Sequence, residues 1–163
     1  MNNQAVIAYF ERLAMQHNAV GHSDVECHFS ALVDEAQNKF AERMHYPCVS
    51  IDTGDIDWQG TVGAVNTHHN ITLFFLDHVA DTGDYERIQD VMDETGTIME
   101  DFMKRMNRDR SRGVDVMKRF NPDGTEAQRV VLDSAGLYGW MLIFDFTQSF
   151  NYLDCGNAWN DEM

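Results

Sequence analysis

The sequence lacks the features that mark membrane-spanning, secreted and disulfide-stabilised proteins. It has two prolines and three cysteines in 163 residues, and no apolar run approaches the roughly 20 residues that cross a bilayer. Cys27, Cys48 and Cys155 are odd in number and form no CxxC pair, which predicts reduced thiols. The first residues carry neither the basic nor the apolar segment of a secretory signal, so we expect a protein made in the cytoplasm.

Motifs for nucleotide binding and nucleophilic catalysis are also missing. Gly54, Gly60 and Gly63 have the wrong spacing for a phosphate-binding loop, and the chain contains neither a GK[ST] triplet nor a GxSxG elbow. Cys27 and His28 are neighbours in sequence, which does not establish the spatial pair that a thiolate nucleophile needs. We therefore expect neither an enzyme nor a bound cofactor.

Histidines and acids are plentiful, but their spacing does not match a known metal site. His17, His22 and His28 cluster in the sequence, yet no HExxH or paired-cysteine spacing supplies the converging ligands of a zinc site. His68 and His69 are adjacent on a predicted strand, so their side chains point to opposite faces. We expect no metal. A metal-dependent enzyme that uses His17, His22 or His28 with nearby acids remains an alternative.

The charge is the most unusual bulk property. There are 27 acidic and 12 basic residues, a formal net charge of −15, and such a surface repels phosphate backbones. We expect neither sequence-specific nucleic acid nor a membrane among the partners. Seven of the bases nevertheless lie within sixteen residues, from Lys104 to Arg119. This cluster is either a solvated helix end with a basic loop, or a surface that contacts an acidic partner such as a second copy of the chain.

Hydrophobic periodicity predicts an α+β fold. We expect helices over about 3–17, 30–44 and 84–107, with Ser30 as the N-cap of the second. Strands are predicted over 48–52, 63–79, 128–133 and 138–148, with a possible short strand over 114–120. Gly, Asn and Pro predict turns or bulges at 53–55 and 59–60 and a turn at 121–124. In the strand over 63–79, one face carries Ile71, Leu73 and Phe75 and the other carries Phe74 and Leu76, so we expect it to be central.

Short connections between strands favour a small antiparallel sheet of two hairpins, with four or five strands. The long central helix and the N-terminal helices are expected to pack on this sheet. Residues 1–153 form a single predicted α+β domain, and residues 154–163 form a polar C-terminal tail. The long helix carries an apolar stripe whose methionines predict either core packing or an adaptable subunit interface: Met92, Met99, Met103 and Met106.

Two sequence segments stand out beside the order of the elements: YPCVSID at 46–52 and LYGWMLIFDF at 137–146. These segments and the order of the elements resemble the tail-completion proteins (tail-terminator or neck proteins) of tailed phages and prophages of the Bacteroidetes type. The resemblance implies a non-enzymatic virion protein, made in the host cytoplasm, that forms homo-oligomeric rings, commonly hexamers, and joins other tail and neck proteins. The regions around 30–44 and 104–119 have no counterpart in that family.

A ring subunit needs complementary surfaces on one chain, and an acidic body with a compact basic cluster meets that need. An acidic lumen would also let DNA pass without binding. Another function remains open: an adaptor or interaction module of a contractile injection system, or another acidic binding domain. The candidate interface residues are four arginines of the basic cluster and two aromatic residues: Arg105, Arg108, Arg110, Arg112, Tyr138 and Trp159.

Overall fold

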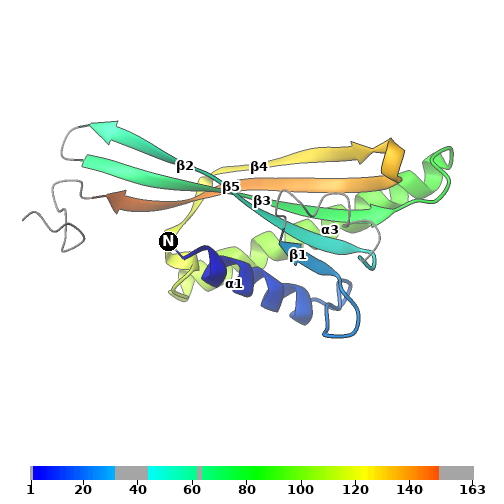
Figure 1. The fold of residues 1–163 in the computed structure, drawn as a ribbon, viewed down its shortest axis with the longest axis horizontal. Coiled ribbons are helices and arrows are strands. Elements are labelled where there is room, and N and C mark those ends of the chain that lie inside the picture. The colour runs from blue at the N-terminus through cyan, green and yellow to red at the C-terminus, as the bar shows by residue number, and fades with distance from the viewer. Residues whose placement is uncertain (1, 32–43, 62–63, 151–163) are drawn as a thin grey trace, which may run out of the picture.

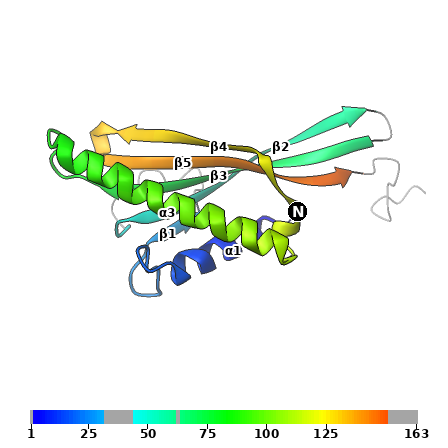
Figure 2. The same ribbon diagram turned by 180° about the vertical axis from the view of Figure 1, so that it is seen from behind.

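The computed structural model describes residues 2–31, 44–61 and 64–150, which form two α helices and a five-stranded sheet. The helices cover one face of an elongated sheet (Figures 1 and 2). This arrangement confirms the predicted α+β class. The elements, in chain order, are α1 (Asn3–Gln16), β1 (Phe29–Ala31), β2 (Cys48–Thr61), β3 (Ala64–His78), α3 (Tyr85–Ser111), β4 (Phe120–Leu132) and β5 (Leu137–Phe150), with 3-10 turns at Met117–Arg119 and Asp133–Ala135.

The sheet has the order β1-β2-β3-β5-β4 and contains the two predicted hairpins, β2–β3 and β4–β5. It is mixed rather than wholly antiparallel, because β1 pairs with β2 in parallel. Ser30 lies in β1 opposite Ser50, so the expected helix N-cap at Ser30 is wrong. The physical reason is burial, because Phe29 beside it fills the core under α1. Residues 32–43 of the predicted second helix lie outside the described residues.

The strands are longer than predicted because β2 continues through the turn or bulge expected at 53–55, and β4 continues through the turn expected at 121–124. β2 continues past 53–55 with a register shift between Thr53 and Ile56, and β4 passes through 121–124 with a shift between Asn121 and Glu126. The residues that favour turns also favour the extra residue of a bulge. At Gly60 an added Cβ would lie 2.1 Å from the carbonyl oxygen of Ala64, so the hairpin requires glycine there. The possible strand over 114–120 is instead the 3-10 turn followed by the start of β4.

The main core lies between the sheet and the two helices. Ile71, Leu73 and Phe75 of β3 are all buried on the helix side, as predicted. Phe102 of α3 packs edge-on against Phe75 with ring centroids 5.2 Å apart, and burial of such aromatic pairs dominates core energetics. The stripe of methionines belongs to this helix–sheet packing: Met92 and Met106 are buried, and Met99 and Met103 pack against the main core.

The opposite face of the sheet carries a smaller apolar cluster. Cys48 and Leu76 are buried there with Met44, and Phe74 packs against them. β3 is therefore apolar on both faces, which confirms the expectation of a central strand. Cys27 and Cys48 are free thiols, and burial raises the pKa of the Cys48 thiol. A buried thiol of raised pKa is a poor nucleophile.

Candidate interaction surface

One end of the sheet extends beyond both helices. Residues 56–61 of β2, 64–69 of β3 and 146–150 of β5 form this extension, which we call the arm (Figures 1 and 2). The cross-strand register runs from Ile56 through His69 to Phe146, and from Gly60 through Val65 to Phe150. Because partners in register share a face, the helix-side face of the body continues along the arm.

This continued face carries three large apolar side chains that are exposed. Ile56, Trp58 and Phe150 are 42%, 60% and 44% exposed, although large apolar side chains are usually buried. The rings of Trp58 and Phe150 meet edge-on with centroids 6.5 Å apart. The same face leads inward to Phe146, which is fully buried in the main core. The arm therefore presents core-type side chains where neither α1 nor α3 covers the sheet.

The arm also has an open strand edge. β1 pairs with β2 only as far as Ile51. Within the described parts of the chain, nothing pairs with the outer edge of β2 from 52 to 61. Unpaired backbone groups on such edges are ready templates for a strand of another chain.

The other face of the arm is polar and largely satisfied within the molecule. Asp145 lies at its base and accepts hydrogen bonds from Thr147 Oγ1 at 2.7 Å and from Asn121 Nδ2 at 3.1 Å. His68 Nδ1 lies 2.8 Å from the Asp145 carboxylate. The arm is thus an amphipathic sheet segment, with an apolar face toward the helix side and a polar face toward the opposite side.

Charge is unevenly distributed along α3. Residues 81–101 contain eight acids and one base, whereas residues 102–119 contain seven bases and two acids. We call these the acidic end and the basic end. The helix runs from the end of the sheet farthest from the arm to the base of the arm (Figure 2). Acids near the N-terminus and bases near the C-terminus complement the helix dipole and so stabilise α3. The same arrangement gives the two ends of the helix opposite charge.

Four of the predicted interface residues lie at the basic end. Arg105 and Arg108 line a hollow of about 340 Å³ between α1 and α3, and His17 lines the same hollow. Arg110 and Arg112 occupy the last turn of α3 and its C-cap, and neither forms an ion pair with a described residue. Of these four arginines, the structure brings Arg105 and Arg108 together beside one hollow. Trp159 lies outside the described residues.

A buried carboxylate holds the basic end against α1. Asp109 is 3% exposed and accepts hydrogen bonds from Tyr9 Oη at 3.0 Å and from Arg105 Nε at 2.8 Å. Burial alone would raise the pKa of Asp109, but the bonds from Arg105 and Tyr9 outweigh it and hold the pKa below its usual value. Burial and the Asp109 contact raise the pKa of Tyr9. This network fixes the position of the last turns of α3.

The acidic end carries a second exposed apolar group. Tyr85 and Val131 are 80% and 47% exposed, and we call them the far-end patch. Leu132 is also 47% exposed, but it follows Val131 on β4 and points to the opposite face of the sheet. Val131 pairs across the strands with Tyr138, and Tyr138 lies within electrostatic range of Tyr85. The predicted interface residue Tyr138 is itself 2% exposed and donates a hydrogen bond to Asp133 Oδ1 at 2.8 Å, so it is a core residue and not a surface contact.

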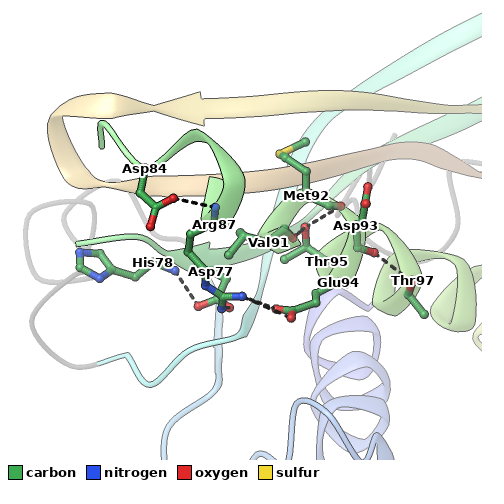
Figure 3. A network of polar contacts seen from close by, with 10 residues as sticks. All are labelled: Asp77, His78, Asp84, Arg87, Val91, Met92, Asp93, Glu94, Thr95 and Thr97. Atoms are coloured by element: carbon green, nitrogen blue, oxygen red, sulfur yellow. Dashed lines mark hydrogen bonds and ion pairs between the residues drawn. The ribbon is translucent and has the colours of Figure 1, made fainter. Parts of the chain in front are cut away.

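The one base of the acidic end is engaged by acids of its own chain. Figure 3 shows Arg87 between two carboxylates, with Nη1 3.3 Å from Glu94 Oε1 and Nη2 3.7 Å from Asp77 Oδ2. Asp84 caps the helix by accepting a hydrogen bond from the Arg87 backbone N–H at 3.0 Å. The remaining carboxylates keep this end strongly negative.

The histidines considered as metal ligands are spread over separate contacts. His22 Nδ1 accepts from the His28 backbone N–H at 3.1 Å, and His28 Nδ1 lies 2.9 Å from the carbonyl oxygen of Pro47. His17 Nε2 lies 3.6 Å from Asp101. In residues 2–31, 44–61 and 64–150, no three histidine, cysteine or acidic side chains converge as a metal site would require.

Sequence reasoning missed the arm. Ile56 and Trp58 alternate with Asp55, Asp57 and Gln59, which is the period-two pattern of a strand with one apolar face. The neighbouring glycines directed the interpretation toward turns or bulges instead. The signal was present, but only the cross-strand register shows that this face is the one that α1 and α3 cover elsewhere.

The sequence matches no protein-family model and no curated protein. None of the helices in the described ranges is long and apolar enough to cross a membrane.

Proposed function

We propose that the protein is a non-enzymatic structural subunit that assembles with copies of itself, as a ring-forming tail terminator or head–tail neck protein of a phage or prophage virion. The single observation that carries assembly is the arm, where Ile56, Trp58 and Phe150 stay exposed on one face and the outer edge of β2 is open among the described residues. The virion setting rests on the resemblance of the segments at 46–52 and 137–146 to tail-completion proteins.

Energetics favour an interface that uses more than the apolar face of the arm. Burying the exposed half of each of the three side chains contributes roughly 1 kcal/mol per residue. Association costs at least about 4 kcal/mol in lost translational and rotational freedom. Backbone pairing along the open edge of β2, together with attraction between charged ends, supplies the remainder. A multi-contact interface of this kind suits a structural ring.

The same arm would also serve an adaptor that binds a different protein, as in a contractile injection system. The oligomeric state separates the two functions. A ring subunit assembles alone at high concentration, whereas an adaptor stays monomeric until its partner is added.

Light-scattering chromatography and negative-stain electron microscopy of the purified chain test the proposal. We expect a concentration-dependent oligomer and ring-shaped particles. Trp58→Ser should shift the chain toward monomer, because it removes the largest exposed apolar side chain of the arm. Val25→Ser is the matched control, since Val25 is 88% exposed in the segment between α1 and β1 and should leave assembly unchanged. A wild-type chain that stays monomeric at high concentration contradicts the proposal.

A further inference from the structure

We infer that the arm of one copy docks on the far-end patch of a second copy, so that the subunits join head to tail. The inference rests on the proposed function and specifies which surfaces meet. It starts from the placement of the exposed apolar side chains. Among the described residues, the large exposed ones divide into three on the arm, three at the opposite end and two elsewhere: Ile56, Trp58 and Phe150; Tyr85, Val131 and Leu132; Met15 and Val25.

These two groups lie at opposite ends of an elongated molecule (Figures 1 and 2). Scattered single apolar residues need no explanation, but two grouped sets at the two ends indicate contact surfaces. Because the two ends lie far apart in the molecule, one set of side chains cannot cover the other set within the same copy. Two copies placed head to tail cover one set of each.

Charge favours the same pairing. The basic end adjoins the arm, because Arg119 directly precedes Phe120, which pairs with Phe146 at the base of the arm. The acidic end adjoins the far-end patch, because Tyr85 is the first residue of α3. Like ends of two copies repel each other, whereas unlike ends attract. The basic end of one copy is therefore attracted to the acidic end of the next copy.

An arm-to-arm contact is disfavoured by the sequence of the arm itself. β2 and β3 contain no lysine or arginine, and β2 carries Asp52, Asp55 and Asp57. Antiparallel pairing of two β2 edges would bring these carboxylates together, which destabilises such a pair. The far end instead offers Arg129, which is exposed, forms no ion pair with a described residue and lies two residues from Val131 on the same face of β4. Arg129 gives the carboxylates of the arm an opposite charge.

A head-to-tail contact uses the arm of one copy and the far-end patch of the other. The first copy therefore keeps its far-end patch free, and the second keeps its arm free. Such a contact extends to further copies, and it closes into a ring when the rotation between copies allows. This is the symmetry that a ring subunit requires.

Mixing two variants tests the inference. Trp58→Ser removes the arm contact and Tyr85→Ser removes the far-end contact, and Tyr85 is 80% exposed, so its loss should not affect folding. Alone, each variant should be monomeric in sedimentation velocity, with a dissociation constant at least about tenfold above wild type. Mixed in equal amounts, they should form a two-chain complex, because each retains the surface that the other lacks. Circular dichroism checks folding, Val131→Ser provides a second far-end variant, and Val25→Ser is the control.

The outcomes separate the inference from the function on which it rests. If Tyr85→Ser and Val131→Ser assemble to the same oligomer as wild type, the head-to-tail contact is wrong but self-assembly stands. The same conclusion follows if the two variants stay monomeric after mixing. A monomeric wild type overturns self-assembly itself. Raising the salt concentration from about 0.05 to about 0.5 M should weaken the complex, because screening shortens the range of charge attraction. Salt-independent assembly contradicts the attraction between unlike ends.

Discussion

The buried carboxylate of Asp109 gives the sharpest stability prediction. It joins Tyr9 of α1 to Arg105 of α3 at 3.0 and 2.8 Å, and its own exposure is 3%. Asp109→Ala removes the acceptor of both donors. The Tyr9 hydroxyl is then left in the core without its partner, and the guanidinium loses its closest carboxylate.

The size of the effect follows from the burial of each partner. Breaking a buried charged pair by removing one member costs about 3–5 kcal/mol. Arg105 is 35% exposed, so water compensates part of its loss and the lower figure applies. We expect Asp109→Ala to lower the free energy of unfolding by roughly 3 kcal/mol. Tyr9→Phe should cost about 1.5–2 kcal/mol, since it removes only the hydrogen bond to a charged acceptor. The double variant should cost less than the sum of the two.

Urea unfolding followed by circular dichroism measures these differences. The low pKa of Asp109 also fixes a pH dependence. Its folded-state pKa lies below the usual 3.8, so the stabilisation is present above pH 3.8 and is lost as the pH falls through the folded-state value. Asp109→Asn should therefore be less stable than wild type at pH 7, and the gap should close in acid. A cost below about 1 kcal/mol for Asp109→Ala, or strict additivity with Tyr9→Phe, would refute the network.

Three further predictions concern single positions. Gly139 has φ of 154°, and an added Cβ would lie 2.0 Å from the Phe75 carbonyl oxygen, so Gly139→Ala should cost roughly 3 kcal/mol in urea unfolding, whereas Gly54→Ala, with 3.5 Å of clearance, should cost under about 1. Burial lowers the pKa of His69 below 6.5, so wild type should lose stability as the pH falls through that range and His69→Gln should lose less. Burial raises the pKa of Asp77 above 3.8, so Asp77→Asn should raise the melting temperature at pH 7, with a gain that shrinks in acid; equal pH profiles contradict either assignment.

The sequence predicted the longest periodic elements well. The helix expected over 84–107 is Tyr85–Ser111, and the strand expected over 63–79 is Ala64–His78. Both have strong local causes. The helix combines an apolar stripe with the Asp84 cap. The strand is apolar on both faces, because one face packs in the main core and the other packs in the smaller apolar cluster. Elements whose own residues determine them can be read from one sequence.

Bulges and sheet edges depend on partners that the sequence does not name. Asn121 and the Pro-Asp-Gly after it have the composition of a turn, yet β5 pairs on both sides of the irregularity. Whether a strand continues past such residues depends on the neighbouring strand. Tyr138 could have been placed correctly, since it lies two residues before Trp140 and four before Leu142 in the strand predicted over 138–148. Period two alone put Tyr138 on the same inward face.

Hydrogen–deuterium exchange of the wild-type chain, measured below and above its assembly concentration, tests the central claim most directly. Head-to-tail docking predicts new amide protection in two separate places, residues 56–61 of the arm and residues 129–132 at the far end. Protection in the arm alone would indicate pairing of two arms. Unchanged exchange in both segments would contradict docking between the two ends.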